Sequence, residues 1–134
     1  MALDVEHEVD LILDGTAVRN FSISRVPPAV RQICEETRTS LEDIDYLVFH
    51  QANRMINETI RKKLGLTPEK APSTLAEFGN TSSASVPLTM TTRIRGELAS
   101  GPRRLLLCGF GIGLSWGSCI VDTDQVCMPE LLEV

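Results

Sequence analysis

Three short segments of the sequence combine residue types that can carry out chemistry. His50 follows the apolar run 46–49, Asn80 follows Gly79, and segment 109–113 reads Gly-Phe-Gly-Ile-Gly. Histidine can hold or release a proton near neutral pH, whereas the asparagine amide remains a hydrogen-bond donor at any working pH. Taken singly, each feature has an ordinary structural explanation, such as a turn or a hydrogen-bonded histidine. Because all three are expected at strand ends, a shared function competes with these separate structural explanations.

The expected strands bring these three segments to one edge of a sheet. We predict a buried parallel strand at 46–49, a short strand at 73–76, and two closing strands at 105–108 and 116–121. His50, Asn80 and the glycine loop then follow the C-terminal ends of neighbouring strands. Sites in open α/β sheets form at these strand ends.

The remaining elements predict a layered α/β fold. Segments 9–13 and 17–23 together suggest a strand with a hairpin-like return, and Pro27-Pro28 is expected to open a helix. Further helices are expected from about residue 52 and over 82–98, and the latter is apolar on nearly every side. The resulting order is βαβαβαββ, a mixed, mostly parallel sheet with helices on both faces. A helix buried all round indicates a further layer beyond this chain.

Bulk composition excludes several classes of function. The chain has 134 residues, a net charge of −5 and 4% aromatic residues, which argues against nucleic-acid binding. The acidic start does not resemble a signal peptide, and the uncharged stretch 105–121 is too rich in glycine for a membrane span. We therefore expect a single domain over 1–134, located in the cytoplasm and without nucleic-acid or membrane partners.

The cysteines do not predict a metal site. There are four, at positions 34, 108, 119 and 127, with no CxxC spacing and no matching histidine cluster. Free thiols are expected, and Cys34, Cys108 and Cys119 lie in apolar surroundings that suggest core positions.

Three motifs together resemble one family of enzymes. The motifs are His50-Gln51-Ala52-Asn53, then 79–87 reading GNTSSASVP, then 109–118 reading GFGIGLSWGS. In order and spacing, across roughly residues 9–122, they are similar to 3-oxoacyl-[acyl-carrier-protein] synthase III of bacterial fatty-acid synthesis. The resemblance implies the C-terminal half of a thiolase-like fold.

The resemblance also implies an activity and a set of site residues. The family carries out a decarboxylative Claisen condensation of acyl-CoA with malonyl-acyl carrier protein and needs no cofactor. Its catalytic histidine and asparagine match His50 and Asn80. Gly111, Ile112 and Gly113 match the loop whose backbone N–H contributes to an oxyanion hole, with Ile112 where many relatives carry glycine. Ala52 and Asn53 match the pantetheine channel, and Arg54 lies near a position that contacts the carrier protein.

The family's nucleophile is a cysteine in an N-terminal half for which this chain has no equivalent segment. Cys108 is the cysteine nearest the site, but it lies within a predicted strand and not at a strand-to-helix turn. We therefore expect the chain alone to be inactive and to need an N-terminal half, with a homodimer as the assembled form. The alternatives are a quinolone- or polyketide-type condensing enzyme of secondary metabolism and a non-catalytic subunit that binds carrier protein.

Overall fold

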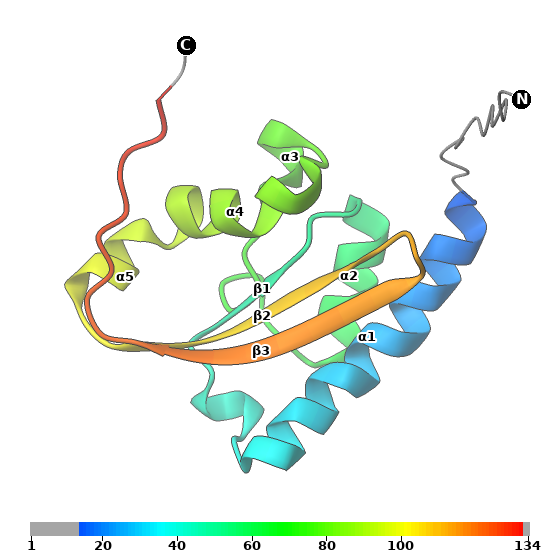
Figure 1. Cartoon of the computed structure of the whole chain (residues 1–134), viewed down its shortest axis with the longest axis horizontal. Helices are drawn as coiled ribbons and strands as arrows, with labels where there is room; N and C mark the ends of the chain where they lie inside the picture. The colour runs from blue at the N-terminus through cyan, green and yellow to red at the C-terminus, as the bar shows by residue number, and fades with distance from the viewer. Residues whose placement is uncertain (1–13, 133–134) are drawn as a thin grey trace, which may run out of the picture.

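A mixed three-stranded sheet forms the middle of the molecule (Figure 1). The computed structural model describes residues 14–132. Strand β1 (Tyr46–Phe49) pairs in parallel with β2 (Arg103–Gly111), and β2 pairs antiparallel with β3 (Ser115–Thr123). The mixed α/β class expected from the sequence is thus confirmed, and the two closing strands are longer than predicted.

Helices cover both faces of this sheet, as Figure 1 shows. Successive side chains of a strand point to opposite faces. Leu47 and Phe49 accordingly pack in the cluster under α1 (Gly15–Thr37) and α2 (Arg54–Lys63), whereas Val48 packs on the other side with Ile94 and Leu98. Because both faces of β1 and β2 are buried, their sequences read as continuous apolar runs.

Helix α1 overturns the prediction of a strand at 17–23 and of a helix opening at Pro27-Pro28. The helix begins after Asp14, whose carboxylate accepts hydrogen bonds from the backbone of Thr16 (3.0 Å) and Ala17 (2.9 Å). It continues through both prolines. The reason is a stripe of four buried residues spaced four apart, which packs against α2 and the sheet: Ser22, Val26, Val30 and Cys34. The strand expected at 9–13 lies outside the described residues.

Helix α2 confirms the helix expected after His50. Asn53 caps it, because its side-chain oxygen accepts a hydrogen bond from the backbone N–H of Ile56 at 2.9 Å. Ile56 and Ile60 are buried against the core, and Gly65, with φ of 70°, stands just after the last turn. The start of α2 thus fixes the direction in which the chain continues after His50.

The segment expected as a strand at 73–76 is instead the start of a short helix. Helix α3 (Leu75–Phe78) begins after Thr74 and ends at Gly79, whose φ is 65°. Residues 73–76 do not pair with the sheet. Within the described chain, β1 pairs with β2 alone, and the other neighbour of β2 is β3. Asn80 therefore follows a helix and not a strand.

The long helix expected over 82–98 is divided. A single turn η2 (Ser82–Ala84) leads into α4 (Ser85–Arg93), and α5 (Arg95–Ser100) follows a break at Ile94. The helix is also not buried on all sides in this chain, since Ser83, Ala84 and Pro87 are exposed. No helix among residues 14–132 has the length and apolar character needed to cross a membrane.

Candidate active site

His50 is anchored by its backbone directly after β1. Its N–H donates to the carbonyl of Cys108 on β2 at 2.8 Å, which continues the parallel pairing by one residue. Its carbonyl accepts from the backbone of Ala52 at 3.2 Å and from Nδ2 of Asn57 at 2.9 Å. The sharp turn from strand to helix α2 is therefore fully hydrogen-bonded around the histidine.

The imidazole ring is held on two sides. Nδ1 lies 2.8 Å from Oγ of Ser85, and the ring meets Phe110 edge-on with centroids 5.4 Å apart. The contact with Ser85 is made by Nδ1, and no side chain among residues 14–132 hydrogen-bonds to Nε2. Burial lowers the pKa of His50 below its usual value, while a backbone hydrogen bond with Ser82 acts in the opposite direction. At neutral pH the ring is uncharged.

This lowered pKa predicts a loss of stability on acidification. Between the unfolded pKa of about 6.5 and the lower folded pKa, the unfolded chain binds a proton that the folded chain does not. We therefore expect the urea midpoint to fall as the pH is lowered from about 7 through this window. The variant His50→Gln should show a smaller fall over the same range. Equal pH dependence in both proteins would contradict the assignment.

Asn80 presents its amide in a defined orientation. Its Oδ1 accepts from the backbone N–H of Ser82 at 2.9 Å, and its Nδ2 donates to the carbonyl of Ala52 at 3.2 Å. A flipped amide would set donor against donor and acceptor against acceptor. Since one N–H of Nδ2 is used by Ala52, the other remains for a ligand.

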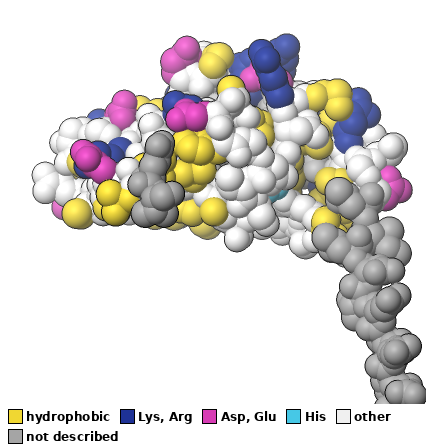
Figure 2. Space-filling view, turned by 90° about the horizontal axis from the view of Figure 1, so that it is seen from above, with side chains coloured by type: hydrophobic (Ala, Val, Ile, Leu, Met, Phe, Trp, Pro, Cys, Tyr) yellow, Lys and Arg dark blue, Asp and Glu magenta, His cyan; other side chains and the backbone are white. Residues whose placement is uncertain are grey.

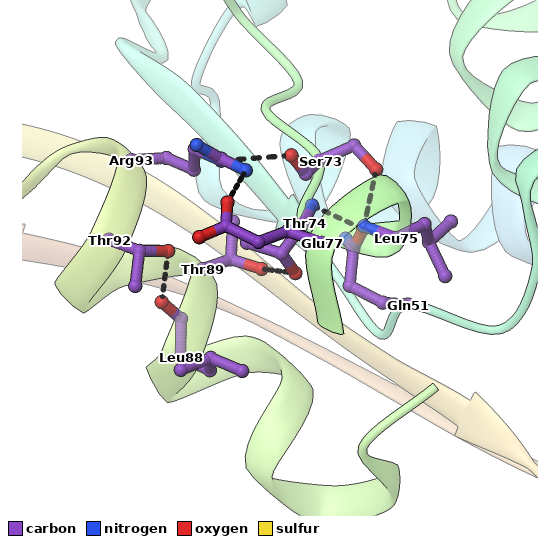
Figure 3. A network of polar contacts seen from close by, with 9 residues as sticks. All are labelled: Gln51, Ser73, Thr74, Leu75, Glu77, Leu88, Thr89, Thr92 and Arg93. Carbon is purple, nitrogen blue, oxygen red and sulfur yellow. Dashed lines mark hydrogen bonds and ion pairs between the residues drawn. The ribbon is translucent and has the colours of Figure 1, made fainter. Parts of the chain in front are cut away.

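Gln51, the buried residue after His50, is hydrogen-bonded to the residues that precede α3 (Figure 3). Gln51 is fully buried; its Nε2 donates to the carbonyl of Phe49 at 2.9 Å. Its Oε1 accepts from Oγ of Ser73 at 2.8 Å and from the backbone N–H of Thr74 at 3.2 Å. Thr74 in turn shares a 3.1 Å hydrogen bond with Thr89 of α4. The end of β1, the start of α3 and helix α4 are thereby held together.

The predicted site residues meet at one cavity. A space of about 900 Å³ is lined by six of them. They are His50, Ala52, Asn53, Asn80, Gly111 and Ile112. In the view of Figure 2, a small area of histidine side chain is visible within an uncharged part of the surface. These residues therefore converge as expected, although Asn80 follows the short helix α3 and not a strand.

Two predicted residues do not line this cavity. Arg54 borders a neighbouring space of about 540 Å³, which Ala52, Asn53 and Asn80 also line. Gly113, with φ of 144°, lies in the hairpin turn between β2 and β3. A β-carbon at Gly113 would approach Oγ of Ser115 to 2.9 Å, so this position favours glycine for its backbone shape.

The cysteines behave largely as expected. Cys34 and Cys108 are buried, but Cys119 is exposed, contrary to the prediction, because nothing in the described chain covers that side of β3. Burial raises the pKa of Cys108 to about 11, while the neighbouring Ser118 hydroxyl opposes the rise and Cys119 adds to it. A thiol in this state is a poor nucleophile.

Cys108 is accordingly expected to resist alkylation in the folded chain. At pH 8 a pKa of about 11 leaves only about one thiolate in a thousand. Iodoacetamide should label the exposed Cys119 and Cys127 first, as read by peptide mass mapping. Labelling of Cys108 as fast as Cys127 would show that it is more reactive than its environment allows.

Ser85 and Gln51 were not singled out from the sequence. Ser85 stands in a run of small residues typical of a buried helix, and Gln51 stands within the motif 50–53. A polar residue directly after a buried strand, and a serine at a helix start, were the available signals. Within residues 14–132, no group of three or more His, Cys, Asp or Glu side chains is arranged to hold a metal ion.

A mixed α/β fold that brings a histidine, an asparagine and a glycine-rich hairpin to one cavity matches the class of enzyme that the motifs resembled. The family model for the C-terminal domain of 3-oxoacyl-[acyl-carrier-protein (ACP)] synthase III matches residues 34–123. The chain therefore belongs to this family. Beta-ketoacyl-[acyl-carrier-protein] synthase III of Streptococcus sanguinis (strain SK36) is 39% identical over 118 residues, which cover 87% of this chain and 36% of the relative.

Solved structures agree on the fold. A 3-oxoacyl-(acyl-carrier protein) synthase from Burkholderia xenovorans LB400 matches with a TM-score of 0.80 at 34% identity, over 84% of this chain and 32% of that one. The synthase III of Pseudomonas aeruginosa PAO1 matches with a TM-score of 0.77 at 30% identity, over 96% of this chain and 40% of that one. The expected thiolase-like fold is confirmed. The chain spans about a third of the length of the curated relatives it matches.

Proposed function

We propose that this chain supplies the decarboxylation half of a condensing acyltransferase that joins acyl-CoA to malonyl-acyl carrier protein at the start of fatty-acid biosynthesis. The observation that carries the proposal is the convergence of His50 and Asn80 on one cavity, where one N–H of the Asn80 amide is left for a ligand. Membership of the synthase III family supports the reaction class.

The two side chains suit the charge that forms in this reaction. When the malonyl carboxylate leaves as CO2, the electron pair of the broken C–C bond moves onto the thioester oxygen. Two neutral donors, the ring N–H of His50 and the amide N–H of Asn80, stabilise that enolate. The asparagine cannot titrate, and burial keeps the histidine uncharged at neutral pH. The enolate carbon then attacks the acyl thioester and releases the cysteine thiolate.

The other lining residues have supporting roles in this proposal. Backbone N–H groups of Gly111–Gly113 contribute to the oxyanion hole of the acyl intermediate, and Ile112 narrows the pocket beside them. Ala52 and Asn53 border the pantetheine path, which fits their position on both cavities. Arg54 contacts the acidic carrier protein from the neighbouring cavity. No cofactor takes part.

The nucleophilic cysteine comes from the N-terminal part that the longer relatives have. Three large apolar residues at the β2–β3 turn support docking of that part here, because they are 43–48% exposed in this chain. They are Ile112, Leu114 and Trp116. Such residues at one end of the sheet are suited to packing against another layer. A homodimer of the completed enzyme is the proposed assembly.

Intact-protein mass after incubation with a short acyl-CoA tests this division of labour. The chain is incubated alone and with the N-terminal part of a synthase III relative. We expect an acyl group, removable by hydroxylamine, on the N-terminal part alone. An acyl group on this chain by itself would mean that one of its own cysteines is a nucleophile. Decarboxylation of malonyl thioester should require both parts.

A further inference from the structure

Ser85 is a fully buried hydroxyl that touches the candidate catalytic histidine. It is the first residue of α4, and its Oγ lies 2.8 Å from Nδ1 of His50. The same oxygen accepts the backbone N–H of Gln51 at 3.2 Å. The carbonyl of Ser85 accepts from Oγ1 of Thr89 at 2.8 Å, which fixes the start of the helix.

Within residues 14–132, the hydroxyl hydrogen of Ser85 has one acceptor. Oγ already accepts from Gln51, and within residues 14–132 the other polar atom at hydrogen-bond distance is Nδ1 of His50. If Nδ1 carried the imidazole proton and donated it to Oγ, the hydroxyl hydrogen would be buried without an acceptor. Buried donors without acceptors are costly and rare. The arrangement therefore favours the serine as donor and Nδ1 as acceptor.

We propose that Ser85 is a positioning residue that holds neutral His50 in the tautomer with its proton on Nε2. The consequence for chemistry rests on the function proposed above, because the enolate needs an N–H and not a bare nitrogen from this ring. Ser85 touches no substrate in this account and acts through His50. The backbone N–H of Gln51 strengthens the device, because a hydroxyl that accepts one hydrogen bond donates more strongly in another.

The tautomer can be measured directly in the unmodified chain. The sequence has two histidines, at positions 7 and 50, so a chain with ¹⁵N-labelled histidine gives two sets of ring signals that His7→Gln assigns. Two-bond ¹H–¹⁵N correlation spectra at about pH 7.5 separate the two neutral tautomers. We expect at least about a ten-fold excess of the Nε2–H form at His50. An Nδ1–H form in the unmodified chain overturns the proposal without any variant.

Ser85→Ala and Ser83→Ala form a matched pair of variants. Ser83 is exposed and lies in the preceding turn η2, so its loss should leave the tautomer ratio of His50 unchanged. Ser85→Ala should lower the ratio several-fold. An unchanged ratio in a folded Ser85→Ala chain would assign the tautomer to another cause. If Ser85→Ala does not fold, the measurement on the unmodified chain decides alone.

The outcome is separable from that of the proposed function. A dominant Nε2–H form together with undiminished decarboxylation in a His50→Ala enzyme would leave the tautomer assignment standing and remove the enolate role. A dominant Nδ1–H form would overturn the tautomer assignment, and loss of decarboxylation in His50→Ala would then show that His50 serves the reaction in some way other than as an Nε2–H donor.

Discussion

Replacing Asn80 with aspartate is expected to lower the rate of malonyl-thioester decarboxylation about 10²–10³-fold in the enzyme completed by an N-terminal part. The carboxylate oxygen that replaces Nδ2 cannot donate to the enolate and adds negative charge beside it. It also faces the carbonyl of Ala52, which in the unmodified chain accepts a hydrogen bond from Nδ2 at 3.2 Å. Release of CO2 from malonyl thioester under single-turnover conditions measures the effect.

Asn20→Asp is the matched control for this experiment. Asn20 is exposed on α1, and the substitution makes the same change of charge away from the cavity. Its decarboxylation rate should stay within about two-fold of the unmodified enzyme, as expected for an exposed site. Equal rates for Asn80→Asp and Asn20→Asp would remove Asn80 from the reaction.

Loss of the Gln51 side chain is expected to destabilise the fold by about 2–4 kcal/mol. Gln51→Ala leaves the carbonyl of Phe49 and the nearly buried N–H of Thr74 without their partners and opens a cavity beside them. The midpoint of urea unfolding should fall accordingly, with the slope unchanged.

The control is Gln32→Ala on α1. Gln32 is exposed, and among residues 14–132 its side chain hydrogen-bonds only to Glu36, so we expect a change within about 0.5 kcal/mol. If Gln51→Ala were no less stable than Gln32→Ala, the buried network of Figure 3 would not contribute to holding the site together.

The predictable parts of the fold are those where local signals agree. The run Tyr46–Phe49, the helix after His50 and the closing hairpin are predictable, because apolar pattern and turn residues point the same way. Helix α1 was missed because residues 17–23 alternate roughly and two prolines interrupt the pattern. Its buried stripe, from Ser22 to Cys34, depends on packing against α2 and the sheet.

The site shows the same division between local and long-range information. His50 was placed correctly from its position after an apolar run. Asn80 was expected at the end of a strand, yet it follows helix α3 and reaches the cavity because Gln51 holds residues 73 and 74. That contact joins residues more than twenty positions apart, so no local pattern reveals it. The role of Ser85 depends in the same way on a distance across 35 residues.

The decarboxylation rates of His50→Ala, Asn80→Ala and the double variant, each in the completed enzyme, test the central claim most directly. If both side chains stabilise one enolate oxygen, each single variant loses about 10²–10³-fold, and the double variant loses less than the product of the two. Decarboxylation at the unmodified rate in either single variant would contradict the account and leave a binding role for this chain.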